Sequence, residues 1–168
     1  MSDTTTPKSM LFETQEEWHE FYENFGKNGR TFQDFTNLTP QSMEVIYMVA
    51  YNQFNAGKYD EAEKVFQLLS VMNHFDPRFW TGLGASREMQ KKFDEAIKAY
   101  AYLTILDLEN PTPALLTGKC NLAAGRQADA ESAFHACVFI CKDKLEHAEV
   151  KAQAQSLLEL LAKNQPAS

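Results

Sequence analysis

Apolar side chains recur on one helical face towards the end of the chain. The residues on this face are Val150, Ala154, Leu157, Leu158 and Leu161, with Lys, Glu and Gln between them. Spacings of three and four residues place such side chains on one side of an α-helix. We therefore expect a C-terminal helix within residues 144–163 that caps the elements before it.

Aromatic residues form a second stripe near the N-terminus, at Trp18, Phe21, Tyr22 and Phe25. Their i, i+3, i+4, i+7 spacing again indicates one face of a helix. The capping-box sequence Thr14–Glu17 precedes the stripe, and Gly26 ends it. We expect a helical segment within residues 13–38 and a flexible tail over residues 1–12.

Between these segments the sequence repeats itself every 34 residues. Three positions carry the period: a small residue at Ala50, Gly84 and Gly118, an alanine at Ala62, Ala96 and Ala130, and an aromatic ring at Phe66, Tyr100 and Phe134. Small residues let two helices approach closely, and the ring fills the space beside them. A period of 34 with this spacing is typical of tetratricopeptide repeats, whose unit is a helix–turn–helix.

Helix-start residues agree with this period. Thr39, Asp76 and Thr112 each place a capping side chain before a proline, and Asp60 with Glu63 resembles a capping box. We expect first helices near 40–55, 77–90 and 112–124, and second helices near 60–73, 94–107 and 128–141. The predicted fold class is all-α: a tetratricopeptide-repeat solenoid of three helix pairs over residues 39–143, with an N-terminal helix and a C-terminal capping helix.

The first helix of each repeat lines the concave side of such a solenoid. The positions that face inwards are Tyr47, Tyr51 and Phe54 in the first repeat, Thr81, Ala85, Glu88 and Met89 in the second, and Leu115, Lys119 and Leu122 in the third. This predicts an apolar, aromatic groove. A preformed groove of this kind suits an extended peptide with spaced apolar anchors.

Core packing is the alternative interpretation for the three aromatic rings of the first repeat. The standard repeat positions assign the core face to Ile46, Val49, Ala50 and Gln53. The rings then lie on the neighbouring face, which favours the groove. Cationic clamps that grip a C-terminal carboxylate need Lys, Asn and Arg at positions where this chain has Tyr47, Tyr51, Thr112 and Leu116, so we do not expect carboxylate capture.

Charge narrows the range of partners. The formal net charge is −7 and the isoelectric point about 5.1. An acidic surface repels phosphate backbones and anionic lipids, which argues against nucleic acid as a partner. No apolar run approaches the ~20 residues that span a bilayer, so we expect no membrane insertion. The three cysteines, an odd number, and the absence of a secretory signal favour the cytoplasm.

We find no pattern that indicates catalysis, a cofactor or a metal. Cys137 and Cys141 lie one helical turn apart with His135 nearby, but no Cys-x-x-Cys or His-x-x-x-His pair accompanies them. Buried structural cysteines are the simpler interpretation. Phosphate-binding loops and nucleophile elbows are also missing. The sequence predicts a protein that is not an enzyme.

A closer resemblance rests on segments both inside and outside the repeats. These are Gly29–Phe35, Tyr47–Tyr59, Ala62–Leu69, Phe79–Ala85 and Lys151–Leu158. Together they resemble the class II chaperones of bacterial type III secretion, which hold two hydrophobic translocator proteins in the cytoplasm. The resemblance implies binding of an extended N-terminal client segment, with a Pro-x-Leu-x-x-Pro-like pattern, in the concave groove.

The resemblance also implies a homodimer, formed through N-terminal helices when no client is bound. The stripe of Trp18, Phe21, Tyr22 and Phe25 would then pack against a second copy. Packing of the stripe on the first repeat of its own chain is equally compatible with the sequence. For the function as a whole, a general repeat scaffold for other cytosolic proteins is the alternative.

Overall fold

The structure is a computed structural model that describes residues 29–142 and 144–164. All regular secondary structure within these residues is helical. The elements are η2 (Phe32–Phe35), α2 (Pro40–Asn55), α3 (Tyr59–Met72), α4 (Pro77–Met89), α5 (Phe93–Leu106), α6 (Thr112–Ala123), α7 (Gln127–Cys141), η3 (Leu145–His147) and α8 (Ala148–Asn164). The predicted stripe Trp18, Phe21, Tyr22, Phe25 and the predicted tail lie outside the described residues.

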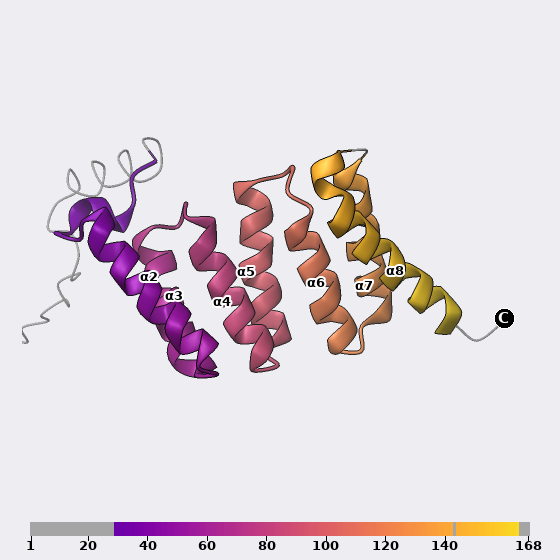
Figure 1. Ribbon diagram of the computed structural model, residues 1–168, viewed down its shortest axis with the longest axis horizontal. Coiled ribbons are helices and arrows are strands. Elements are labelled where there is room, and N and C mark those ends of the chain that lie inside the picture. Colours follow the sequence, from indigo (N-terminus) through magenta and orange to yellow (C-terminus); the bar gives the residue numbers. More distant parts are fainter. Residues whose placement is uncertain (1–28, 143, 165–168) are drawn as a thin grey trace, which may run out of the picture.

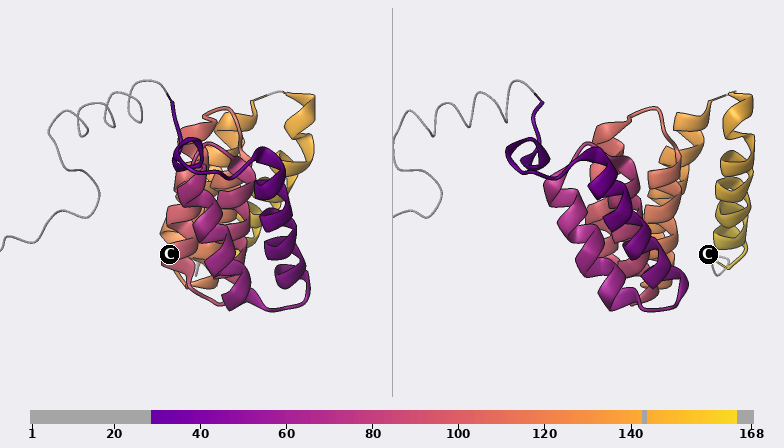
Figure 2. Two further views of the ribbon diagram at one scale, coloured as in Figure 1. Left: turned by 90° about the vertical axis from the view of Figure 1, so that its left-hand side faces the viewer. Right: turned by 60° about the vertical axis from the view of Figure 1, so that its left-hand side comes forward.

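The helices stand in one row in chain order, from α2 to α8 (Figure 1). Each helix packs mainly on the one before and the one after it, and α2 also contacts α4, as α6 contacts α8. Figure 2 views the row from its α2 end, with α2 and α3 in front of the later pairs. This arrangement confirms the predicted all-α solenoid, and the ends of α2 to α7 lie within one residue of the predicted bounds.

Two of the predicted helix starts are confirmed. The Thr39 hydroxyl accepts a hydrogen bond from the Ser42 N–H at 3.1 Å, ahead of α2. The Asp76 carboxylate accepts from the Arg78 N–H at 2.9 Å, ahead of α4. These side chains satisfy backbone donors that the first helical turn leaves without a partner.

Two other predicted caps are wrong. The residue before α6 is Pro111, while Thr112 is already helical and its N–H donates to Asn110 Oδ1 at 3.0 Å. The residue before α3 is Lys58, without a side-chain cap. Asp60 pairs with Lys64 instead, and Glu63 reaches across to the next repeat. Long-range partners thus replace the local capping box.

The repeat positions form the core as predicted. Ala62, Ala96 and Ala130 have no exposed surface. The Tyr100 ring lies on Gly84 and the Phe134 ring on Gly118, so closely that a Cβ at either glycine would be 2.3 Å from the ring. Only glycine permits this approach of the two helices within a pair.

One predicted core residue is exposed. Val49 of α2 retains 47% of its surface, whereas Leu83, one repeat later in α4, retains 2%. The difference arises because Leu83 packs into a cluster with residues of α3, such as Leu69. Among the described residues, no second helix precedes α2 to cover Val49 in the same way. Met43 and Ala50 are the buried residues of α2.

Candidate functional site

An apolar pocket of about 330 Å³ opens between α2, α3 and α4. The residues that line it are Tyr47, Tyr51, Phe54, Phe66, Pro77, Arg78, Thr81, Gly82 and Ala85. Five of them, Tyr47, Tyr51, Phe54, Thr81 and Ala85, are predicted groove residues, so the structure brings the predicted residues of the first two repeats together. The size suits one or two apolar side chains.

The rings of α2 form one wall of the pocket. Tyr47 and Tyr51 are stacked, with ring centroids 6.2 Å apart. Tyr47 also packs edge-on against Phe66, with a centroid separation of 6.0 Å, and is half-buried. Tyr51 keeps 46% of its surface exposed. The core and groove interpretations are therefore both correct for Tyr47, which packs on the core with one face and lines the pocket.

The floor of the pocket is formed by Phe66 and Gly82, which were not among the predicted groove residues. Phe66 occupies the repeat position of Tyr100 and Phe134, whose rings lie on a glycine of their own repeat. In the first repeat the residue at this glycine position is Ala50, which belongs to the same core cluster as Phe66. The Phe66 ring lies on Gly82 of the next helix instead, where a Cβ would be 2.4 Å from it.

The wall formed by α4 consists of small residues and is mostly apolar. The Thr81 hydroxyl donates to the Pro77 carbonyl oxygen at 2.8 Å, so its polar group is satisfied within the helix. Ala85 follows one turn later and adds only a methyl group. Because Thr81, Gly82 and Ala85 are all small, they leave space in front of the α2 rings.

Arg78 borders the pocket at the start of α4. Its guanidinium lies 4.8 Å from the centre of the Tyr47 ring, in cation–π geometry. It also pairs with Asp76 at 2.8 Å and with Glu44 of α2 at 3.0 Å. Glu44 and Arg78 are 34 residues apart, at the second position of the first and second repeats. Because the second position of each repeat faces the groove, this position could have identified Arg78 from the sequence.

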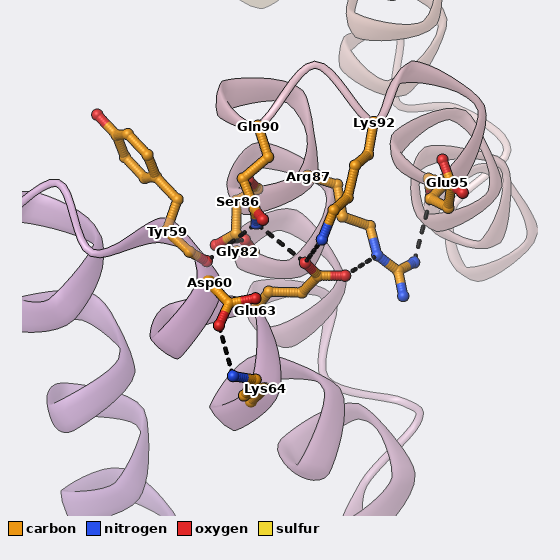
Figure 3. Close-up of polar contacts among 10 residues, drawn as sticks. All are labelled: Tyr59, Asp60, Glu63, Lys64, Gly82, Ser86, Arg87, Gln90, Lys92 and Glu95. Carbon is orange, nitrogen blue, oxygen red and sulfur yellow. Dashed lines mark hydrogen bonds and ion pairs between the residues drawn. The ribbon is translucent and has the colours of Figure 1, made fainter.

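A largely buried carboxylate, that of Glu63, joins α3 to α4 (Figure 3). Glu63 accepts from Arg87 at 2.9 Å, from Gln90 at 2.9 Å and from Lys92 at 2.8 Å, and its side chain is 13% exposed. Burial by itself raises the pKa of Glu63, but these hydrogen bonds outweigh it and lower the pKa to about 2. The carboxylate is therefore ionised at neutral pH and ties together the helices that frame the pocket.

The predicted groove residues of the third repeat have a different environment. Leu115 is 4% exposed and packs with α7 and α8 residues such as Phe134 and Ala154, so its assignment to an open groove is wrong. Leu122 is half-buried against the same cluster. Lys119 is half-buried and donates to Gln153 of α8 at 3.2 Å. In the second repeat, Met89 is 52% exposed outside the pocket.

In the part of the chain that the structure describes, the cysteines and other potential metal ligands form no metal site. Cys137 and Cys141 have no exposed surface and pack in the core that α7 forms with α8. Burial, and then the neighbouring Cys141, raise the pKa of the Cys137 thiol to about 12. Across residues 29–142 and 144–164, no three His, Cys, Asp or Glu side chains come together as a potential metal site. Within the same ranges no helix is both long and apolar enough to cross a membrane.

Comparison with known proteins identifies the family. The sequence profile of the tetratricopeptide repeat matches residues 47–108 and 90–138. The chain is 37% identical to low calcium response locus protein H of Yersinia pestis over 139 residues, which are 83% of each protein. It is 35% identical to the type III secretion translocator chaperone SycD of Yersinia enterocolitica, with a TM-score of 0.72, over 79% of this chain and 98% of SycD. The chain belongs to the family of type III secretion translocator chaperones.

Solved complexes exist for members of this chaperone family. SycD has been solved with a peptide of the translocator YopD; this structure matches with a TM-score of 0.70 and 34% identity, over 78% of this chain and 100% of SycD. PcrH has been solved with the chaperone-binding regions of PopD and of PopB. The PopD complex matches with a TM-score of 0.71 and 30% identity, over 77% of this chain and 98% of PcrH. An alternative dimer of SycD is also known.

Proposed function

We propose that this chaperone binds hydrophobic translocator proteins of a bacterial type III secretion system in the cytoplasm and keeps them soluble. The observation that carries this proposal is the apolar pocket between α2 and α4, in a family whose members have been solved with translocator peptides. An extended segment near the N-terminus of the client places an apolar side chain in the pocket. The protein acts by binding and performs no catalysis.

Preformed aromatic walls make such binding favourable. Tyr47 is stacked with Tyr51 and packed against Phe66 before any client arrives. Little side-chain entropy is therefore lost when an apolar residue enters, and the rings contribute large buried areas. The walls of small residues on α4 let the client backbone approach closely. The contact is limited in area, which suits a complex that must dissociate before secretion.

The surface charge complements this role. A translocator carries long apolar segments that self-associate in water, and a bound chaperone covers one of them. The net charge of −7 makes chaperone–client complexes repel one another and remain dispersed. We propose two different clients, as PcrH binds regions of both PopD and PopB. Both clients would use the same pocket.

The rest of the predicted groove extends this site in our proposal. Met89, Lys119 and Leu122 follow the pocket along the first helices, and the client chain would pass over them beyond its anchor. We further propose that the unloaded chaperone is a homodimer through Trp18, Phe21, Tyr22 and Phe25, with the alternative dimer of SycD as the supporting precedent. Sedimentation of a variant with alanine at these four positions tests the dimer separately from client binding.

Co-expression with a candidate translocator tests the function. We expect soluble co-purification with the native chaperone and its loss with Tyr47→Ala/Tyr51→Ala. The matched control is Val45→Ala/Val49→Ala, because these residues are exposed by 66% and 47% on the opposite face of α2. Circular dichroism first establishes that each variant is folded. Equal binding by both variants contradicts the pocket assignment, and failure of the native chain to bind any translocator contradicts the chaperone function.

A further inference from the structure

A carboxylate stands beside the pocket on α4. Glu88 occupies in the second repeat the position that Phe54 has in the first, and it follows Ala85 by one helical turn. Phe54 and Ala85 both line the pocket. Glu88 therefore shares their face of the solenoid, at the C-terminal end of α4, and its side chain is half-buried.

A buried donor holds this carboxylate in place. The Tyr100 hydroxyl, on a residue that is 1% exposed, donates to Glu88 Oε2 at 2.9 Å. The Cys120 residue of α6 is fully buried near this carboxylate. Burial first, and then the charge of Glu88, raise the pKa of Cys120 to about 12, so the thiol keeps its proton. The carboxylate thus has a fixed orientation set by the core.

The Tyr100 hydroxyl carries no charge. Most other carboxylates with cross-helix contacts pair with a cation, as Glu63 does with Lys92, Glu44 with Arg78 and Asp94 with Arg126. Within residues 29–142 and 144–164, no Lys, Arg or His nitrogen comes within 4.0 Å of the Glu88 carboxylate. A carboxylate has about four acceptor sites, so Glu88 retains sites for a further donor. It is an oriented negative charge without a positive partner.

We propose that Glu88 binds a lysine or arginine side chain of the client segment, next to the apolar residue seated in the pocket. This inference rests on the proposed function and adds a rule for which segments are accepted. Ala85 and Glu88 are about 4.5 Å apart along the helix axis, since a helix rises ~1.5 Å per residue. An extended peptide advances ~3.3 Å per residue, so the basic residue lies within about three positions of the apolar anchor.

A charged hydrogen bond of this kind raises the affinity for segments with a basic residue beside the anchor about tenfold. Backbone and apolar contacts in the pocket do not depend on it. The two contributions therefore separate experimentally: the pocket sets whether a segment binds, and Glu88 sets which residue is preferred beside the anchor. A segment that carries glutamate at the same place is disfavoured by repulsion.

Short synthetic peptides with a Pro-x-Leu-x-x-Pro core test this rule. Each x is in turn lysine, glutamine or glutamate, and affinity is measured by fluorescence anisotropy with the full-length native chain. We compare it with Glu88→Gln, in which the amide oxygen still accepts from Tyr100, and with Glu95→Gln, which removes an exposed carboxylate from α5. We expect lysine at one x position to bind about tenfold more tightly than glutamine, in the native chain and in Glu95→Gln.

In Glu88→Gln this preference should disappear, while the glutamine peptide binds within about twofold of its native affinity. A lysine preference that survives in Glu88→Gln, or its absence from the native chain although the glutamine peptides bind, overturns the assignment of Glu88 and leaves the proposed function intact. If no peptide binds the folded native chain, the peptide-binding function fails and the inference fails with it. Circular dichroism verifies that both variants are folded.

Discussion

Tyr47 and Leu115 occupy the same position of the repeat, yet Tyr47 lines an open pocket and Leu115 is 4% exposed. The helices that face them explain the difference. Opposite Tyr47, α4 presents Gly82 and Ala85, which are small. At the same repeat positions α8 presents Val150, which packs into the core, and Gln153, which accepts from Lys119.

The comparison shows that the repeat position sets only the direction of a side chain. The residues of the next first helix decide whether that side chain faces a cavity or a packed interface. An open site therefore arises where bulky rings on one helix meet small residues on the following one. The pocket end and the capped end of this solenoid differ for this reason, and substitutions at each end should have different consequences.

The largest expected effect is on stability at the capped end. Leu115→Ala removes a buried side chain from the α6–α7–α8 core and should lower the free energy of unfolding by about 3 kcal/mol. Urea denaturation followed by circular dichroism measures it. The matched control is Leu160→Ala on α8, where the side chain is 50% exposed and the loss should be small. Equal losses for the two variants would mean that Leu115 is not a core residue.

At the pocket end, Gly82→Ala should affect stability and binding together. The added methyl group would be 2.4 Å from the Phe66 ring, which must move into the pocket or the core. We expect a loss of about 2 kcal/mol in the free energy of unfolding and weaker client binding. Thr81→Ala, at the adjacent residue, is the control for unfolding measurements. Unchanged stability in Gly82→Ala would show that the Phe66 ring does not rest on this glycine.

The hydrogen bonds of Glu63 should make the pocket end sensitive to acid. Glu63→Gln should lower the free energy of unfolding by about 1.5 kcal/mol at neutral pH, because two cations lose their partner. The pKa falls from 4.5 to about 2 on folding, so the stabilisation is complete above pH 4.5 and is lost as the pH falls towards about 2. Thermal unfolding across this range, with Glu61→Gln as the exposed control, measures it. If Glu63→Gln is still less stable than the native chain at the lowest pH, the charge of Glu63 does not account for the stabilisation.

The smallest expected effect on stability is that of Ala85→Gln, which places on α4 the residue that α8 has at this repeat position. Glutamine at this site would extend over the pocket opening, as Gln153 extends towards Lys119. We expect a change of less than about 0.5 kcal/mol in stability and about tenfold weaker client binding. Ala101→Gln, at an exposed site of α5, should change neither quantity. Native affinity in Ala85→Gln would indicate that the client does not enter between α2 and α4.

The sequence was sufficient to predict the helices because the repeat constrains them. Ala62, Phe66 and their counterparts one and two repeats later recur at positions that only a stacked helix pair satisfies, so the helix bounds followed within one residue. The pocket residues of α2 followed from the same register. Packing between repeats was harder to predict from the sequence. Glu63 resembled part of a local capping box, whereas its partners Arg87 and Lys92 lie in the next repeat.

The other differences between the prediction and the structure also arise from packing between repeats. Leu115 was assigned to the groove because the repeat register predicts the direction in which its side chain points. The register does not predict the size of the residues that face this side chain. Phe66 and Gly82 were not assigned to the pocket, since the contact of this ring with the next helix depends on the absence of a side chain at Gly82. Comparing residues at the same repeat position in successive first helices would have revealed both features.

Site-specific photocrosslinking shows directly whether the client enters the pocket between α2 and α4. A benzophenone amino acid replaces Tyr51 in one variant and Val49 in another; the two residues are exposed by 46% and 47% and point to opposite sides of α2. Each variant is co-expressed with a translocator and irradiated. We expect a crosslink to the client's N-terminal segment from position 51 and none from position 49. A crosslink to that segment from position 49 alone would contradict the pocket as the client site.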